Sequence, residues 1–99
     1  MFARVLQVSG SPDEIEAGVA LYRNQVLPYA RDATGFRGYL VLLDREGGRA
    51  LAMSFWASEE AMLAFEERAQ TFRGLVAETS GFELGDITSY EVALLELTP

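Results

Sequence analysis

The chain has 99 residues, with 15 acidic and 8 basic side chains, a formal net charge of -7, and neither histidine nor cysteine. All the basic residues are arginine. These counts exclude disulfides, thiolate chemistry, lysine Schiff bases, and histidine as a general base or metal ligand. The acidic balance also lacks the basic footprint of a nucleic-acid or anionic-membrane surface. With no basic leader and no long apolar segment, we expect one cytoplasmic domain spanning residues 1–99.

The N-terminal third predicts a strand followed by a long helix. Phe2–Val8 contains β-branched and aromatic residues and ends at a Ser-Gly pair, which is typical of a strand. Ser11 and Glu14 fit a capping box around Pro12, so the helix should begin at Pro12. Its apolar residues recur every three or four positions and predict a single buried stripe, made of Ile15, Val19, Tyr22, Val26, Tyr29 and Ala33.

Pro28 interrupts this helical pattern. Proline has no N–H and crowds the carbonyl four residues before it, so it weakens the helix around it. We therefore expect a bend near residues 25–27, and Gly35 as the left-handed residue that ends the helix.

The middle of the chain predicts a β-hairpin. Two apolar segments, Phe36–Leu43 and Arg49–Trp56, flank a turn that contains Gly47 and Gly48. A one-residue slip between the strands would change every cross-strand pair. If Leu43 lies opposite Ala50, the pairs that share its face are Val41 with Ala52, Tyr39 with Ser54, and Arg37 with Trp56.

A second helix follows the hairpin. Ser58 is its predicted N-cap, and Arg73 suits the negative end of its dipole. Its buried stripe should consist of Met62, Phe65, Ala69, Phe72 and Val76, ending before Gly81. The acidic residues expected on its solvent side are Glu59, Glu60, Glu66 and Glu67.

The C-terminal segment predicts a fourth strand, Thr88–Leu97, with a turn or bulge at Gly85-Asp86 before it. The element order is then β-α-β-β-α-β. This order is typical of a ferredoxin-like α+β sandwich, in which a sheet of four antiparallel strands carries both helices on one face.

Both faces of the predicted sheet are apolar. The hairpin places Leu40 and Leu42 on one face and Tyr39 and Val41 on the other, whereas a monomeric sandwich would have polar residues on its outer face. Burying such side chains is worth about 1.5–3 kcal/mol each. We therefore expect a homodimer that packs through this sheet face. The alternative cover is a loop or the C-terminal tail, and no segment is long enough for it.

Several short motifs together resemble one known family. VLPYARDATGFRGY carries the late proline of the first helix, SFW ends the hairpin, and Ser-Glu-Glu-Ala begins the second helix. With the opening strand, these resemble the antibiotic biosynthesis monooxygenase domain family over essentially the whole chain. The resemblance implies a small dimeric α+β barrel, and the family includes cofactor-free monooxygenases of polycyclic phenols, quinol-type monooxygenases and haem-degrading enzymes. Haem degradation is not expected here, because no histidine can ligate the iron.

Five residues are candidates for lining a substrate pocket: Trp56, Tyr39, Arg37, Tyr22 and Ser54. Trp56 matches the tryptophan that the resemblance places in the cavity, and its other role is a core anchor whose N–H binds a backbone carbonyl. The tyrosine hydroxyls could orient a phenolic substrate, although Tyr22 lies in a predicted core stripe. Tyr39 faces small residues, among them Ser54, which leave space beside it.

Two arginines lie within predicted strands. Arg4 and Arg37 either pair with an acid such as Glu91 or contact an anion or phenolate. No residue is assigned a catalytic role, and no metal or cofactor is expected.

These features support two hypotheses. The first is a homodimeric protein whose apolar pocket, between sheet and helices, takes an aromatic, polyketide-like or quinol molecule. As an enzyme it would be a cofactor-independent monooxygenase that supplies desolvation and orientation. The alternative is a non-catalytic ligand-binding or stress-related dimer of the same fold. The expected partners are a second copy of the chain and a small apolar or aromatic ligand.

Overall fold

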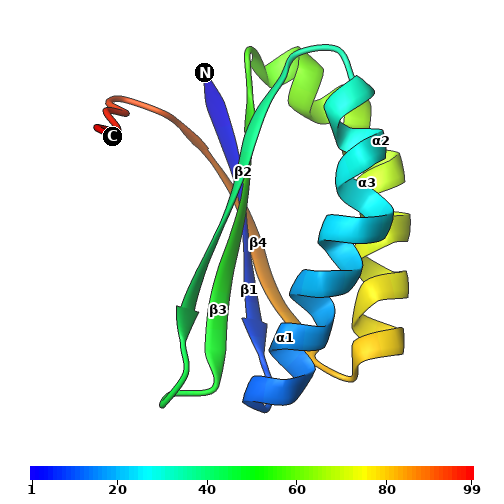
Figure 1. Cartoon of the computed structure of the whole chain (residues 1–99). Coiled ribbons are helices and arrows are strands. Elements are labelled where there is room, and N and C mark those ends of the chain that lie inside the picture. The colour runs from blue at the N-terminus through cyan, green and yellow to red at the C-terminus, as the bar shows by residue number, and fades with distance from the viewer.

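The computed structural model describes all 99 residues and has the ferredoxin-like α+β fold that the sequence predicts. The four antiparallel strands lie in the order β2-β3-β1-β4. Figure 1 shows the helices on one face of this sheet and the opposite face bare. The elements are β1 (Phe2–Ser9), α1 (Pro12–Leu21), the π-helical turn η1 (Tyr22–Val26), α2 (Leu27–Asp32), β2 (Phe36–Asp44), β3 (Arg49–Trp56), α3 (Glu59–Ser80) and β4 (Glu83–Glu91).

The start of α1 is the predicted capping box. Glu14 donates its backbone N–H to the Ser11 hydroxyl at 3.1 Å, and Ser11 donates its own N–H to the Glu14 carboxylate at 2.8 Å. Pro12 occupies the first turn, where its missing N–H costs no hydrogen bond. The predicted start of the helix at Pro12 is therefore confirmed.

The predicted bend is confirmed as the turn η1, in which the N–H of Leu27 bonds to the carbonyl of Tyr22, five residues back. This turn holds one residue more than an α-helical turn, so the residues after it are rotated by about 100° from the expected phase. The predicted burial of Tyr29 is consequently wrong. Its side chain is 63% exposed, and Ala30, which is fully buried, occupies the core position instead.

The hairpin register is confirmed for Leu43 with Ala50, and for Tyr39 with Ser54. The predicted pair of Arg37 with Trp56 is wrong, because a bulge between Phe36 and Gly38 adds one residue to β2. Phe36 is therefore the residue opposite Trp56. Arg37 lies in the bulge, and its side chain is exposed.

The last strand lies earlier in the chain than predicted, at Glu83–Glu91 instead of Thr88–Leu97. β4 ends at Glu91, which pairs with Phe2 at the very start of β1. β1 is the only strand that β4 pairs with, and one last backbone hydrogen bond, from the N–H of Val92 to the carbonyl of Met1 at 2.8 Å, ends the pairing. Residues 92–99 have no regular structure, and Figure 1 shows them turning away from the sheet. The bulge predicted at Gly85-Asp86 is confirmed, inside β4 rather than before it.

Two apolar clusters form the core between sheet and helices. One joins Leu6, Val8 and Ala50 of the sheet to Ile15 of α1. The other gathers four residues near the far end of the sheet, namely Ala30, Trp56, Met62 and Phe65. The space between the two clusters is where the candidate site lies.

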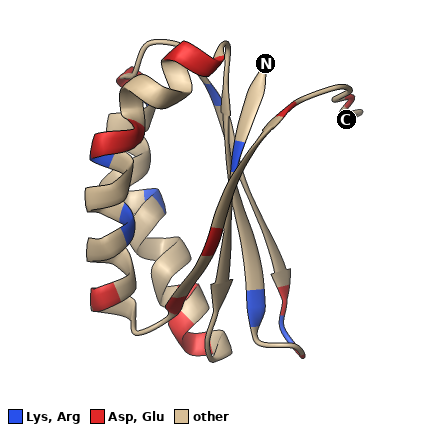
Figure 2. Ribbon diagram, turned by 180° about the vertical axis from the view of Figure 1, so that it is seen from behind, with Lys and Arg blue, Asp and Glu red and all other residues tan.

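Charged side chains are spread over the surface. Figure 2 shows acidic segments on the helices and along β4, with arginine segments scattered among them rather than massed on one face. None of the helices combines the length and the apolar character needed to cross a lipid bilayer.

Candidate functional site

A hollow of about 250 Å³ lies between the inner face of the sheet and the helices. We call it the large chamber, and its wall is mostly apolar: Leu6, Val8, Ile15, Val19, Val76 and Phe82. A smaller hollow of about 50 Å³ adjoins it, and we call this one the tryptophan chamber because Trp56 lines it. Five residues line both chambers and form the boundary between them: the polar side chains Tyr22, Tyr39 and Arg73, with Leu6 and Ala52 of the sheet.

The inner sheet face carries one polar row between apolar rows. The register aligns Tyr39 of β2, Ser54 of β3, Arg4 of β1 and Ser89 of β4 across all four strands. One neighbouring row contains Phe36, Trp56 and Phe2, and the other contains Val41, Ala52 and Leu6. Hydrogen-bonding groups are therefore concentrated at a single level of the cavity.

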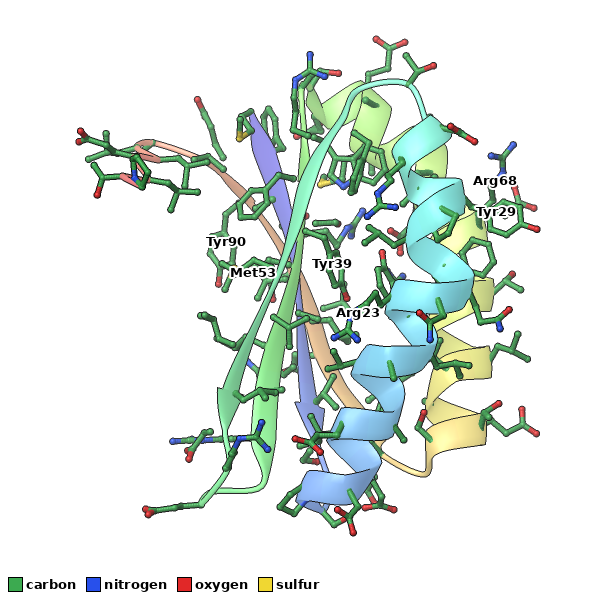
Figure 3. All side chains as sticks on the ribbon, viewed as in Figure 1. Arg23, Tyr29, Tyr39, Met53, Arg68 and Tyr90 are labelled. Carbon is green, nitrogen blue, oxygen red and sulfur yellow. The ribbon has the colours of Figure 1, made fainter.

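Tyr22 and Tyr39 meet across the cavity. Their rings are stacked, with centroids 4.1 Å apart and planes 11° from parallel. Tyr22 comes from the turn η1 and Tyr39 from β2, so the pair joins the helical layer to the sheet. Figure 3 shows Tyr39 pointing from the sheet toward the helices, with Arg23 nearby.

Both tyrosine hydroxyls keep their protons at neutral pH. Burial raises the pKa of Tyr22 to about 12, opposed by the positive charge of Arg73 and by the Tyr39 hydroxyl. Burial also raises the pKa of Tyr39 strongly, with Tyr22 adding to the shift and Arg73 opposing it. Such hydroxyls are hydrogen-bond donors to a ligand oxygen, not general bases.

One carboxylate in the cavity faces two guanidinium groups. Glu66 of α3 lies 3.1 Å from Nη2 of Arg4 through its Oε2, and its Oε1 accepts from Nη2 of Arg73. The three side chains are 22%, 15% and 12% exposed respectively, so solvent screens them little. We call these residues the Arg-Glu-Arg cluster. Its net charge is one positive unit. Nε of Arg4 is buried with no hydrogen-bond partner, and Nη2 contacts Glu66 as an ion pair that lies outside hydrogen-bond geometry.

One prediction about this cluster is wrong, since Glu66 was expected on the solvent side of its helix. For Arg4, which was expected either to pair with an acid such as Glu91 or to contact an anion, the structure shows a pair with a different acid. The side chain of Glu66 instead points inward and takes the place of Glu91 as the partner of Arg4. Glu91 lies one row away, opposite Phe2, and is exposed.

Trp56 combines two roles. Its side chain is 2% exposed and packs against Phe36 and Phe65, with ring centroids 5.4 Å and 5.1 Å away. Its indole Nε1 donates to the Ser54 hydroxyl at 2.9 Å, not to a backbone carbonyl. Trp56 is thus a core anchor that also forms a wall of the tryptophan chamber.

Four of the five predicted pocket residues come together: Trp56, Tyr39, Tyr22 and Ser54 all line the tryptophan chamber. Arg37 lines neither chamber, because the bulge in β2 leaves its side chain in solvent. No group of three acidic side chains forms that could hold a metal ion.

Sequence reasoning missed Arg73, which it assigned to the helix dipole. A signal was available, since Glu66 and Arg73 are seven residues apart and each follows a residue of the buried stripe, Phe65 and Phe72. Seven residues are about two helical turns, which places both charges on one side of α3 beside its apolar stripe.

The sequence model of the antibiotic biosynthesis monooxygenase family matches residues 1–81. Two uncharacterised proteins of Mycobacterium tuberculosis are 34% identical over 77 residues and 33% identical over 81 residues. These matches cover 78% and 82% of this chain. The chain spans only about a third of the length of these relatives, 33% and 36%.

Solved structures share the fold. A monooxygenase from Streptomyces coelicolor, from the gene ActVA-Orf6 and in complex with Nanaomycin D, has a TM-score of 0.71 at 18% identity, over 97% of this chain and 92% of that one. A dimeric ferredoxin-like protein from an uncultured marine organism has a TM-score of 0.69 at 15% identity, over 98% of each chain. At these identities the likeness establishes the fold alone.

Proposed function

This chain belongs to the antibiotic biosynthesis monooxygenase family, and from that membership we propose that it binds a small aromatic, phenolic or quinol molecule in the large chamber. The observation that carries the proposal is a half-open, mostly apolar hollow of about 250 Å³ bordered by the stacked tyrosines Tyr22 and Tyr39. Its volume is close to the lower end of small-molecule pockets, about 300–1,000 Å³. A ligand of two or three fused rings suits this space.

The proposed reaction is a monooxygenation without a cofactor. The substrate loses a proton to become a carbanion or phenolate, and its electrons reduce O₂. One oxygen atom becomes the carbonyl oxygen of the product, and the other leaves as water with the two hydrogens of the oxidised carbon. The protein's part is to exclude water, orient the ring, and donate hydrogen bonds from Tyr22 and Tyr39 to the developing oxyanion.

The solved relative from Streptomyces coelicolor supports a ligand-binding role, since it is a monooxygenase in complex with Nanaomycin D on the same fold. The family membership supports oxygenation as the reaction class.

A non-catalytic binding protein is the second candidate, and one observation favours it. No acidic side chain lines the large chamber, and the one that lines the tryptophan chamber, Glu66, is held by Arg4 and Arg73. The cavity therefore offers no free base to remove a proton from the substrate. On this reading, the aromatic molecule binds in the same place and leaves unchanged.

Oxygen uptake separates the two candidates. Anthrone is the probe, and Trp56→Phe is the test variant because the smaller ring enlarges the tryptophan chamber beside the proposed site while staying aromatic. An oxygenase consumes O₂ with anthrone above the buffer rate, and Trp56→Phe changes that rate. Binding of anthrone without any uptake above buffer would leave only the non-catalytic candidate, and absence of binding would count against both.

We also propose that the chain is a homodimer through the outer sheet face. Figure 3 shows Met53 and Tyr90 on this face, on the side away from the helices. Leu40, Leu42 and Tyr90 are 42%, 48% and 57% exposed there, which is a large apolar area to leave in water. The dimeric ferredoxin-like neighbour supports dimerisation of this fold, and the exposed apolar residues support this face as the interface.

A further inference from the structure

The Arg-Glu-Arg cluster is incompletely neutralised. Two guanidinium groups, always charged at biological pH, share the single carboxylate of Glu66. Each guanidinium has five N–H donors, and in Arg4 the buried Nε has no partner while Nη2 has only its ion pair with Glu66. A buried charge without a full set of partners is destabilising, so one further anion at this point would be stabilised.

Other charges around the cluster do not supply that anion. The packed elements contribute Tyr22 of η1 and Tyr39 of β2, whose hydroxyls are neutral, and Arg23, which lines the large chamber. Glu91 of β4 is exposed and forms no ion pair. The chain as a whole has a net charge of -7, so this spot of positive charge is an exception within an acidic protein.

Arg73 is the residue of the cluster to which a further anion can bind. Its side chain is 12% exposed, and it lines the large chamber as well as the tryptophan chamber, next to the stacked tyrosines. An acidic group on an aromatic ring in the large chamber can therefore reach Arg73, while Glu66 stays with Arg4. Within the cluster, the charges of Arg4 and Arg73 would then be balanced by Glu66 and the ligand, while Arg23 is exposed to solvent.

We propose that the ligand of this cavity is a monoanion, an aromatic ring with one acidic oxygen group that binds Arg73 at the boundary between the chambers. This inference rests on the proposed aromatic binding site and adds the charge of its ligand. A carboxylate and an ionised phenol share the chemistry that Arg73 recognises, namely a charged oxygen that accepts from a guanidinium.

The test compares naphthalene-2-carboxylate with naphthalene-2-carboxamide, which has nearly the same shape and no charge. Isothermal titration calorimetry of the wild type is expected to give at least tenfold tighter binding of the carboxylate. A deprotonated nitronaphthol is the phenolate arm, and tighter binding of it than of the carboxylate would assign the group to a phenolate. Equal affinities for carboxylate, phenolate and carboxamide would overturn the inference while leaving the aromatic site intact. No binding of any of them would overturn both.

Two variants distinguish recognition of charge from a structural role. Arg73→Gln should bring the carboxylate-to-carboxamide affinity ratio close to one, with the carboxamide affinity unchanged. Glu66→Gln keeps an acceptor and raises the local charge to two positive units, so it should strengthen carboxylate binding at least threefold. Arg68→Gln is the control, because Arg68 lies on the same helix and is exposed outside the cavity (Figure 3).

Circular dichroism and thermal melting establish that each variant is folded. If Arg73→Gln does not fold, the affinities of Glu66→Gln for the carboxylate and the carboxamide alone test the proposal. Loss of both affinities in Glu66→Gln, or an affinity ratio that neither variant moves, would show that the cluster only supports the fold.

Discussion

The ring of Tyr22, from the π-helical turn of the first helix, lies 4.1 Å from the ring of Tyr39 on β2 and nearly parallel to it. This contact divides the space between sheet and helices into two chambers and places two protonated hydroxyls at their boundary. Helix α1 and the hairpin register jointly create it, since Tyr22 is the C-cap of α1, which sets its orientation, and the register puts Tyr39 opposite Ser54.

Removal of the Tyr39 hydroxyl should weaken the binding of a phenolic ligand. Tyr39→Phe keeps the stacked ring and removes one donor, so the affinity for 2-naphthol should fall about 2- to 10-fold, the effect of a single hydrogen bond. Calorimetric titration measures this. Tyr29→Phe is the matched control, because Tyr29 is 63% exposed on the outer side of the helices (Figure 3). Equal losses in both variants would remove Tyr39 from the site.

Stability should decline in alkali. The pKa of Tyr22 is raised from 10.0 to about 12 by burial, so the folded state holds this proton more tightly than the unfolded state does. The resulting stabilisation is complete below about pH 10 and is lost as the pH rises toward 12. The free energy of unfolding in urea, measured at pH 8, 10 and 11, should fall over the upper interval. Tyr22→Phe should make that fall shallower, and an unchanged slope would contradict the assignment.

Ser54→Ala should destabilise the protein by about 1–3 kcal/mol, because it leaves the buried indole N–H of Trp56 without its acceptor. Ser89→Ala is the control, since Ser89 lies in the same row of the sheet and is exposed. Urea unfolding, followed by the fluorescence of the single tryptophan, measures the free energy of unfolding of both variants. A change below about 0.5 kcal/mol in Ser54→Ala would mean that water replaces the lost hydroxyl.

Two glycine substitutions should act in opposite directions. A Cβ at Gly18 would overlap Cε2 of the Phe82 ring, which lines the large chamber, so Gly18→Ala should cost about 1–3 kcal/mol and weaken ligand binding. A Cβ at Gly74 of α3 meets nothing within 4 Å. Gly74→Ala should therefore stabilise the protein by about 0.5–1 kcal/mol. Thermal melting measures the change in stability of each variant. Changes of the same sign, or of signs opposite to these, would contradict this packing.

The outer sheet face should hold two copies together. Light scattering after size exclusion should give the mass of a dimer for the wild type and of a monomer for Leu40→Glu, because Leu40 lies opposite Met53 on that face. Leu63→Glu serves as the comparison, since Leu63 is 54% exposed on α3. A monomeric wild type would contradict the dimer. A dimer that Leu40→Glu leaves intact would mean that the interface lies elsewhere.

Local rules were enough to predict most of the fold. The capping box at Ser11 and the hairpin register at Tyr39 depend on neighbouring residues, and both are confirmed. The exposure of Tyr29 was not predictable from helical spacing, because a single extra residue in η1 shifts every later position. The end of β4 depends on where β1 begins, a pairing distant in sequence.

The candidate site was only partly predictable for a related reason. The aromatic members Trp56 and Tyr39 could be located from their strand positions, since alternate residues share a face. The Arg-Glu-Arg cluster joins β1 to α3, and which acid meets Arg4 depends on how α3 lies across the sheet. Only its place directly after Phe65 and seven residues before Arg73 distinguishes Glu66 from its exposed neighbour Glu67 in the sequence.

The central claim, that an aromatic ligand binds between the sheet and the helices, is tested most directly by NMR of protein with labelled tyrosine rings. Tyr22 and Tyr39 line the cavity, whereas Tyr29 and Tyr90 are 63% and 57% exposed outside it. Addition of naphthalene-2-carboxylate should shift the ring signals of Tyr22 and Tyr39 and leave those of Tyr29 and Tyr90 in place. Shifts confined to Tyr29 or Tyr90, or no shift at saturating ligand, would contradict the claim.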